Sequence, residues 1–554
     1  MFGRFLNSQS KTITSAAFIL GSASLGSKIL GLFRDRLLAG HFGAGDELDM
    51  YYAAFRIPDL VFNLLIIGAI SAAFIPVFTE FWARNQKEAW LIANGVLNLF
   101  LAVLIFLSII LIFFCPMLIS IITPGFEGEK KEITVALTRI MFLSPLFLAV
   151  SNIFSGILQS FKRFFVYSMA PIMYNIGTIL GILFFVPKIG VYGLAFGVVL
   201  GAFLHMAIQI PSAKFCGYRY RFVFNIYHQG IRKIIKLMVP RTIGLGAFQI
   251  NLIVITAIAS TLASGSIAVF NLSNNFQYIP VGIIGISFAT AAFPSLSQEF
   301  AIQRKKEFAP PYSVRNKYLT GFIQKFSSTF RQILFLIIPL SALIFILRAQ
   351  IVRLVLGTGQ FSWVDTRLTA ACLGLFSLGI FAQSFTPLLS RAFYALHNTL
   401  TPVVISIFSM ALNIGLSFLL VWLLTFNNIF YDFIFENLKL QGISEIAILG
   451  LPLAFSIAGI FNFTLLIFRL HKKLGDLDLK TISRAFFKIL LATLVMAEIT
   501  YLGLYILADL VNMQTFFGVF LQAAGAASIG FLAYLLIARF LNLYEFKKII
   551  NSIR

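Results

Sequence analysis

The chain contains about fourteen stretches of mostly apolar residues, each close to twenty residues or longer, separated by polar segments. A helix that crosses the hydrocarbon core of a bilayer needs about 20 such residues. Because a bilayer offers the backbone no hydrogen-bond partners, spanning segments of this kind must be helical. The pattern predicts an all-α polytopic membrane protein with spans near residues 13–38, 49–79, 91–115, 133–160, 165–187, 190–212, 234–262, 266–298, 327–347, 366–394, 400–425, 446–469, 485–509 and 515–541.

The composition excludes an ordinary soluble domain, since 59% of the 554 residues are hydrophobic, 12% are charged and the mean hydropathy is +0.92. The apolar runs lack the alternation of transmembrane β-strands. Cys115, Cys216 and Cys372 are scattered, which predicts neither a metal site nor a disulfide framework. No phosphate-binding loop, nucleophile motif or paired histidine is present in the sequence, so we expect no cofactor and no enzymatic activity.

The net charge of +22 is unevenly distributed along the chain. Most Lys and Arg residues lie in alternate loops and in the C-terminal tail, whereas the loops near Asp46 and Glu127 are rich in acidic residues. This positive-inside pattern predicts a multi-pass membrane protein with both termini in the cytoplasm. The basic loops are explained by topology and by attraction to anionic lipids, so we expect no nucleic-acid partner.

Internal similarity divides the chain into two predicted six-helix lobes with a C-terminal addition. We expect an N-lobe at 1–215, an amphipathic cytoplasmic connection at 216–236, a C-lobe at 237–475, and helices 13 and 14 with a basic tail at 476–554. In both lobes the second helix carries Gly and Pro at similar places, as in Arg56-Ile-Pro58 and Tyr278-Ile-Pro280. Paired interrupted helices of this kind are typical of the binding site of a transporter.

Charged residues lie within the first two predicted spans, among them Lys28, Arg34, Asp35 and Arg56. A charge at the centre of a membrane helix costs roughly 2.5–3.5 kcal/mol on insertion scales. We therefore expect these side chains to face one another or a water-filled cavity. Because the cations outnumber the acids, the cavity favours an anionic cargo.

A series of motifs, in order and at matching spacing, resembles the MurJ (MviN) lipid II flippases and covers helices 1–12. The motifs are Ser27–Asp35 (SKILGLFRD), Phe42–Gly45, Asp49–Pro58 (DMYYAAFRIP), Gly68–Pro76, Gly156–Phe164 (GILQSFKRF), Ala170–Gly177 (APIMYNIG), Gly190–Gly201 (GVYGLAFGVVLG), Gln249–Asn251, Pro280–Gly285, Pro294–Ser297, Gly359–Phe361 and Arg391–Pro402 (RAFYALHNTLTP).

The resemblance implies the fold of the multidrug/oligosaccharidyl-lipid/polysaccharide (MOP) exporters, with two six-helix lobes around a central cavity. It also implies that the last two helices form an apolar groove for a prenyl tail. The implied cargo is lipid II, an undecaprenyl-pyrophosphate glycopeptide that passes from the inner to the outer leaflet by alternating access. Membrane lipids and cell-wall synthesis proteins are further expected partners, and the expected state is a monomer.

The resemblance also implies a set of cargo-binding residues. Arg34 matches the cavity arginine of the family, and Lys28 stands where an arginine is usual, so it keeps the charge without the bidentate fork. Asp35 and Asp49 match family acids, with pairing of Asp35 to Arg36 as the alternative. Arg56 matches a basic residue of the family, and extension of its side chain to the membrane interface is its alternative role.

The chain departs from the family pattern on helix 8, where Asn274-Asn275 replaces an Asp-Arg pair. Amides bind phosphate more weakly than a guanidinium does. Arg241 is a candidate replacement cation, with anchoring at the interface as its alternative role. The departure leaves two other functions open, a MOP-type flippase for another prenyl-linked oligosaccharide and a non-transporting cell-wall scaffold.

Overall fold

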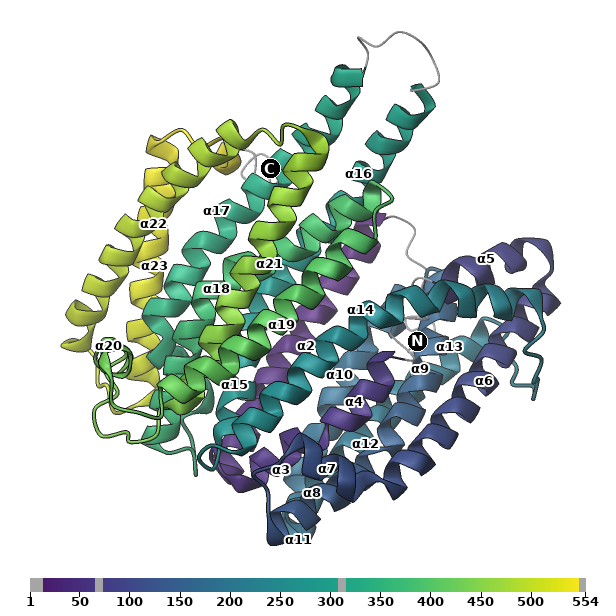
Figure 1. Ribbon diagram of the computed structural model, residues 1–554, viewed down its shortest axis with the longest axis horizontal. Coiled ribbons are helices and arrows are strands. Elements are labelled where there is room, and N and C mark those ends of the chain that lie inside the picture. The colour runs from purple at the N-terminus through teal and green to yellow at the C-terminus, as the bar shows by residue number, and fades with distance from the viewer. Residues whose placement is uncertain (1–12, 65–72, 307–314, 548–554) are drawn as a thin grey trace. The chain divides into compact units, whose positions relative to one another are not determined.

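The computed structural model describes residues 13–64, 73–306 and 315–547, and this part of the chain contains helices and connecting segments without strands. Its contacts divide the chain into two compact units. The first unit comprises Met1–Ala268 with Thr358–Phe361, and the second comprises Val269–Gly357 with Ser362–Arg554. Figure 1 shows that each unit is a bundle of long helices.

The first unit consists of helices joined by short connections. Several of these helices begin within one or two residues of the end of the preceding helix. They are α2 (Ile13–Phe42), α3 (Asp46–Ala54), α4 (Arg56–Phe62), α5 (Ile75–Arg84), α6 (Gln86–Phe113), α7 (Cys115–Ile122), α8 (Gly128–Met141), α9 (Leu143–Ser160), α10 (Phe164–Leu180), the π-helix η3 (Gly181–Phe185), α11 (Val186–Ile189), α12 (Tyr192–Ala207), α13 (Ile210–Phe215) and α14 (Gln229–Ser260).

The second unit contains the remaining helices, and the first turn of α15 belongs to the first unit. They are α15 (Ser266–Pro280), the π-helix η4 (Val281–Ile286), α16 (Ser287–Lys306), α17 (Arg315–Leu356), α18 (Trp363–Ala395), α19 (Leu400–Leu423), α20 (Ile429–Asn437), the short 3₁₀ helix η6 (Ala447–Leu449), α21 (Gly450–Leu474), α22 (Leu479–Ala508) and α23 (Phe516–Phe540).

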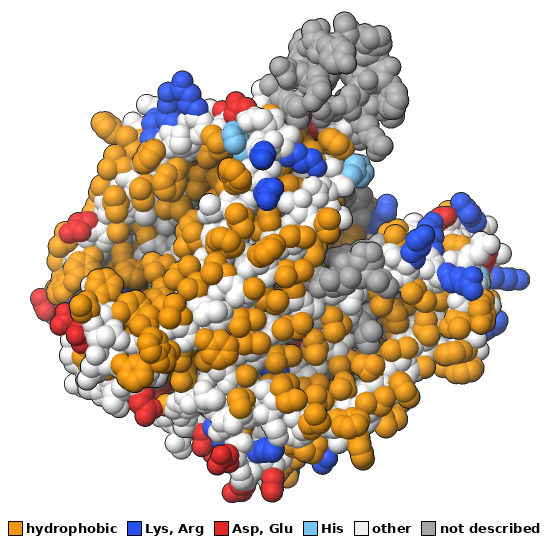
Figure 2. Space-filling model, in the orientation of Figure 1, with side chains coloured by type: hydrophobic (Ala, Val, Ile, Leu, Met, Phe, Trp, Pro, Cys, Tyr) orange, Lys and Arg blue, Asp and Glu red, His pale blue; other side chains and the backbone are white. Residues whose placement is uncertain are grey.

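The all-α polytopic class predicted from the sequence is confirmed. Within the described residues, eleven helices are long and apolar enough to cross a membrane, and they coincide with eleven of the predicted spans. Of the other three predicted spans, 13–38 corresponds to α2, and 234–262 corresponds to α14, whose apolar part is Gly246–Ser260. The span at 49–79 includes residues 65–72, which lie outside the described residues. Hydrophobic side chains cover much of the visible surface along the helices, and charged side chains gather near helix ends (Figure 2).

Glycines bring α10 and α12 into close contact. A Cβ added at Gly177 would lie 2.4 Å from the Cα of Gly201, and one at Gly181 would lie 2.3 Å from the Cα of Gly197. Gly177 on α10 and Gly181 at the start of η3 are four residues apart, as are Gly197 and Gly201 on α12. This is the small-residue spacing that lets membrane helices approach at the backbone. Larger residues at these four positions would force the two helices apart.

The core of the second unit is built from stacked phenylalanines. The rings of Phe330 on α17 and Phe385 on α18 stack with centroids 4.1 Å apart, and Phe463 of α21 packs against Phe385 at 5.5 Å. The two C-terminal helices α22 and α23 pack against each other and against α17. The hydroxyl of Tyr534 on α23 donates to the carbonyl of Phe335 on α17 at 2.7 Å.

The amphipathic connection between the sixth and seventh predicted spans is not helical along its first half. Residues 218–228 form an irregular segment, and α14 begins at Gln229, so the last part of the connection continues directly into a long helix. Two asparagines on α6 hold the segment. Asn94 Nδ2 donates to the carbonyl of Arg219 at 3.1 Å, and Asn98 Nδ2 donates to that of Val223 at 3.0 Å. These bonds give the backbone carbonyls of the irregular segment the hydrogen-bond partners that they would have in a helix.

Both segments that the sequence marks with Gly and Pro contain wider helical turns. In the first half, π-helical residues occur at 63–64 and 73–74, and in the second half η4 follows directly after Pro280. A π-helical turn loosens the regular hydrogen-bond ladder and is common at functional sites. The interruptions therefore occur at corresponding places of the two predicted repeats.

The compact units divide the chain at a different place from the lobes expected from the sequence. The boundary falls between Ala268 and Val269, and α14 packs in the first unit against α4, α5, α6 and α7. The boundary at 216–236 was predicted from the repeated sequence pattern, whereas the two units are defined by contacts between residues. The two functional lobes stay a prediction.

Candidate functional site

The charged residues of α2 form a hydrogen-bonded group with α10. Arg34 Nη2 and Nε donate to Oδ1 of Asp35 at 2.8 and 3.1 Å, and Arg34 Nη1 donates to Oδ1 of Asn175 on α10 at 3.3 Å. The Asp35 side chain is buried, whereas 22% of the Arg34 side chain remains exposed. Pairing of Asp35 with Arg36 was the alternative to a cargo-binding role, and the structure shows an ion pair of Asp35 with Arg34.

Asn175 is the residue of this group that the sequence analysis did not assign. Its Nδ2 donates to the backbone carbonyl of Ser27 at 3.1 Å and to that of Pro171 at 3.2 Å, while its Oδ1 accepts from Arg34. One amide therefore links two turns of α2 to α10. A signal was present in the sequence, since Asn175 is a buried amide within an apolar helix and belongs to the Ala170–Gly177 motif.

Lys28 lies about 1.7 turns before Arg34 on α2 and does not face α10 in the same direction. Six residues at about 100° each separate the two side chains by roughly 120° around the helix. Lys28 is partly exposed, and among the described residues it has neither a hydrogen bond nor an ion pair. Of these two cations, Arg34 is thus held by neighbours, whereas Lys28 is partly exposed.

Asp49 holds the beginning of α15 within the first unit. Its Oδ2 accepts from the backbone N–H of Gly265 at 2.8 Å and its Oδ1 accepts from that of Ala268 at 2.9 Å. The side chain of Lys130 lies 3.6 Å from Oδ2, and only 1% of Asp49 is exposed. A carboxylate that accepts from the first N–H groups of a helix satisfies them and complements the helix dipole.

Lys130 also bonds Asp46, the first residue of α3. The Lys130 Nζ and the Ser264 hydroxyl both donate to Oδ1 of Asp46 at 2.6 Å. Burial alone would raise the pKa of Asp46, but these two hydrogen bonds outweigh it and lower the pKa. Gly265 is required at this point because its φ is +84° and an added Cβ would lie 1.8 Å from the carbonyl oxygen of Ala44.

Arg56 lies inside the first unit. Its Nε donates to the hydroxyl of Thr256 on α14 at 2.7 Å, and Thr256 in turn donates to the carbonyl of Leu252 at 2.8 Å. Arg56 is buried, so the alternative in which its side chain extends to the membrane interface does not describe the structure. The bond ties α4 to α14, two segments 200 residues apart in the sequence.

The residues proposed on helix 8 belong to α15 in the second unit. Asn274 Oδ1 accepts from Gln277 Nε2 at 2.7 Å, and both Asn274 and Asn275 are partly buried. Arg241 lies in α14, but its side chain falls outside the described residues. The structure therefore brings Arg34 and Asp35 together, places Asp49 and Arg56 elsewhere in the first unit, and places the asparagines in the second.

We expect Asp49→Ala to lower the stability of the protein because two helix-terminal N–H groups lose their acceptor. Loss of an N-terminal helix cap costs about 0.5–2 kcal/mol. Thermal unfolding of the purified protein should show a lower Tm for Asp49→Ala, and a smaller decrease for Asp46→Ala, whose side chain is half exposed. Equal decreases for the two variants would contradict the capping role.

The fold and the charged residues within it define a polytopic helical membrane protein. A multidrug resistance MATE family transporter of the MOP superfamily, in an inward-facing conformation, aligns with a TM-score of 0.61 at 14% identity, covering 81% of this chain and 95% of that one. At this identity the likeness shows the fold alone.

The family model "Lipid II flippase MurJ" matches residues 38–521, and the chain belongs to this family. A structure described as "Lipid II flippase MurJ, inward closed conformation" aligns with a TM-score of 0.73 at 26% identity, covering 95% of this chain and 99% of that one. The resemblance found in the sequence is thereby confirmed, and the family is one of membrane transporters rather than enzymes.

Two curated relatives carry the same description. The probable lipid II flippase MurJ of Buchnera aphidicola subsp. Schizaphis graminum is 30% identical over 541 residues, which are 96% of this chain and 97% of the relative. The lipid II flippase MurJ of Burkholderia cenocepacia is 28% identical over 403 residues, covering 71% and 75%. The similarity to the Buchnera protein thus extends over nearly the whole of both chains.

Proposed function

We propose that this chain transports lipid II from the inner to the outer leaflet of the cytoplasmic membrane by alternating access. The observation that carries the proposal is the match of residues 38–521 to the lipid II flippase family. The cargo carries a pyrophosphate, so a membrane helix with cations at the depth of the hydrocarbon core suits its headgroup. No covalent chemistry is required of the protein.

Lys28 and Arg34 are the residues that we propose to contact the pyrophosphate. The Arg34 side chain is 22% exposed while Asp35 and Asn175 hold its guanidinium, and such prior orientation reduces the entropy lost on binding. Lys28 supplies a point charge about 1.7 turns away. Asp35 and Asn175 act as positioning residues in this proposal.

Asp49 and Arg56 support the site through the structure around it. Both oxygens of Asp49 accept bonds from the beginning of α15, and the Arg56 Nε bonds to α14. Arg241 stays a candidate cation on α14. Because the bonds of Asp49 and the bond of the Arg56 Nε tie helices of the first unit together, we propose positioning roles for both residues.

The asparagines of α15 favour a second candidate function, transport of another prenyl-linked oligosaccharide. Asn274 and Asn275 stand where the family pattern has an Asp-Arg pair, and amides hydrogen-bond sugar hydroxyls as well as phosphate oxygens. A loss of one cation weakens phosphate binding more than sugar binding. A non-transporting scaffold of the cell-wall machinery is the remaining alternative.

The C-terminal helices α22 and α23 are proposed to receive the prenyl tail. Their outer surfaces carry exposed apolar side chains, including Leu494, Tyr505, Phe517 and Leu532. Transfer of a long isoprenoid chain out of water is favourable by about 0.8 kcal/mol of free energy for each buried CH₂ group. Its transfer from lipid to such an apolar surface changes the free energy little. The protein is proposed to act as a monomer, with contacts to cell-wall synthesis proteins.

We expect both termini to lie in the cytoplasm, with Glu127 and Asp432 outside. Both residues are exposed, so single cysteines at these positions in a cysteine-free background should react with an impermeant thiol reagent added to intact cells. A cysteine at Lys473, which is exposed near the other end of α21, should be protected until the cells are opened. Protection of both outer sites with labelling at Lys473 would reverse the proposed orientation.

Complementation tests the function directly. The gene should restore growth to a bacterium depleted of its own lipid II flippase, and lipid II should become accessible on the outer surface of those cells. Failure of both readouts while the protein is inserted at normal levels would favour another prenyl-linked cargo or a scaffold. Accumulation of another lipid-linked oligosaccharide after deletion from its own host would identify the former.

A further inference from the structure

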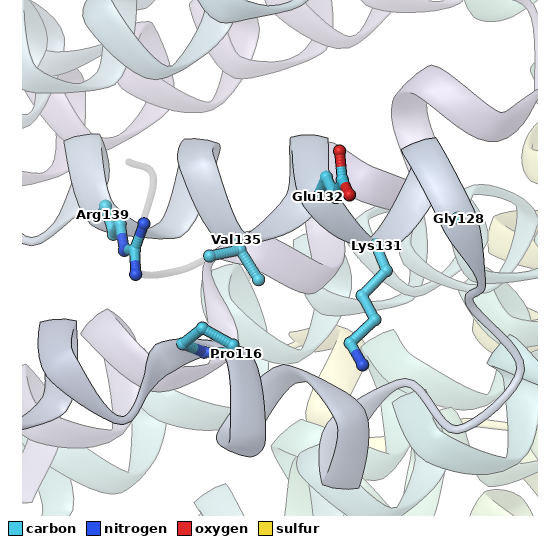
Figure 3. A pocket seen from close by; sticks show the side chains of 6 residues that line it. All are labelled: Pro116, Gly128, Lys131, Glu132, Val135 and Arg139. Carbon is cyan, nitrogen blue, oxygen red and sulfur yellow. The ribbon is translucent and has the colours of Figure 1, made fainter.

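A pocket separate from the candidate transport site lies between α7 and α8 in the first unit. It has a volume of about 460 Å³, and its lining residues are Pro116, Gly128, Lys131, Glu132, Val135 and Arg139. Figure 3 shows Lys131, Val135 and Arg139 along one side of α8, opposite Pro116 of α7. None of these residues belongs to the group formed by Arg34, Asp35 and Asn175.

Two cations extend into this pocket from the same helix. The side chains of Lys131 and Arg139 both point from α8 toward α7, whereas the carboxylate of Glu132 points away from α7 (Figure 3). Lys131 and Glu132 have no hydrogen bond or ion pair within the part of the chain that the structure describes. Lys131 thus differs from its neighbour Lys130, which is bound to Asp46.

The pocket lies at the end of a membrane-spanning helix. Arg139 Nε donates to the carbonyl of Ile112 at 3.4 Å, and Ile112 is the penultimate residue of the span α6. The polar region between the hydrocarbon core and water is about 5–8 Å thick on each side of a bilayer. We therefore expect a cation bound to the last turn of α6 to lie near the depth of the lipid headgroups.

Exposed apolar side chains occur on α7, which lines the pocket, and at the end of α6. Phe113 at the end of α6 is 76% exposed, and Met117 and Ile121 on α7 are 62% and 59% exposed. These side chains provide a surface for acyl chains next to a pair of cations. Cations next to apolar side chains suit an amphiphile, in which a phosphate and hydrocarbon chains belong to one molecule.

We propose that this pocket binds the phosphodiester headgroup of a membrane phospholipid. Lys131 and Arg139 contact the phosphate oxygens, and the acyl chains lie against Phe113, Met117 and Ile121. Because Glu132 adds a negative charge at the rim, the pocket favours a headgroup with an ammonium beside the phosphate, such as phosphatidylethanolamine, over the anionic phosphatidylglycerol. In the proposed orientation the lipid belongs to the outer leaflet.

Native mass spectrometry of the full-length protein with each lipid tests the site. The double variant Lys131→Gln/Arg139→Gln should bind phosphatidylethanolamine at least tenfold more weakly than the unchanged protein. Lys188→Gln, which removes an exposed cation on α11, should bind it normally. Unchanged lipid binding by the double variant would overturn the proposal, and unchanged Tm values would show that folding is not the cause of a loss.

Two further experiments distinguish a lipid phosphate from free inorganic phosphate and test the headgroup preference. Inorganic phosphate at millimolar concentration should not displace the lipid, and displacement would assign the pocket to a free anion. Glu132→Gln should shift the preference at least threefold toward phosphatidylglycerol, because it removes the carboxylate that attracts the ammonium of phosphatidylethanolamine. No shift in that variant would overturn the assigned preference for a zwitterionic lipid.

Discussion

Arg34→Ala is expected to abolish transport of the lipid-linked cargo while the protein still inserts into the membrane. A hydrogen bond to a charged group contributes about 1.5–3 kcal/mol, so loss of the guanidinium should weaken cargo binding roughly ten- to hundredfold. The measurement is growth of a flippase-depleted strain, together with the amount of lipid II accessible on the outer surface. Arg34→Lys, which keeps the charge without the fork, should retain part of the activity.

A second variant separates the role of Arg34 in transport from its role in folding. Arg34→Ala removes the ion-pair partner of the buried Asp35, and breaking a buried pair costs about 3–5 kcal/mol. In Arg34→Ala/Asp35→Asn the carboxylate charge is removed as well, so the protein should regain stability without regaining transport. Normal transport by this double variant would show that the cation at position 34 is not needed for the cargo.

The charge at Lys28 is expected to matter more than the shape of its side chain. Lys28→Arg should support growth, Lys28→Gln should support it weakly, and Lys28→Glu should not support it. Two unit charges 4 Å apart interact by about 4 kcal/mol at an effective dielectric constant of 20, so reversal of the charge changes an attraction into a repulsion. The comparison requires equal expression of the three variants.

An exposed cation far from α2 provides the control for Lys28. Lys188 lies on α11, and Lys188→Glu introduces the same change of charge at an exposed position in the same unit. This variant should grow like the unchanged protein, because it leaves α2 intact. If Lys28→Glu transports as well as Lys188→Glu does, Lys28 does not contact the pyrophosphate.

The site was partly predictable because its charges are conspicuous in an apolar sequence. Lys28, Arg34 and Asp35 stand out in the first span, and their types indicate an anionic ligand. Asn175 was not assigned because an amide in a membrane helix has many possible partners. Only the packing of α10 against α2 brings its side chain within 3.3 Å of Arg34 across 141 residues of sequence.

The roles of Asp49 and Arg56 were not predictable from the residues around them. Both match family positions, and a charge in a span suggests a ligand when it is considered alone. In the structure Asp49 accepts from the beginning of α15 and Arg56 donates to Thr256, each more than 190 residues away in the sequence. Sequence patterns carry no information about which distant helix end or hydroxyl lies opposite such a charge.

By itself, the sequence determined the class of fold, the approximate position of eleven spans and the family, because hydropathy acts over about twenty consecutive residues and motifs keep their spacing along the chain. The tertiary structure alone decided the irregular course of residues 218–228, the packing of α14 in the first unit and the partners of Asp35, Asp49 and Arg56. Those features depend on hydrogen bonds between helices, which form only after the helices have packed.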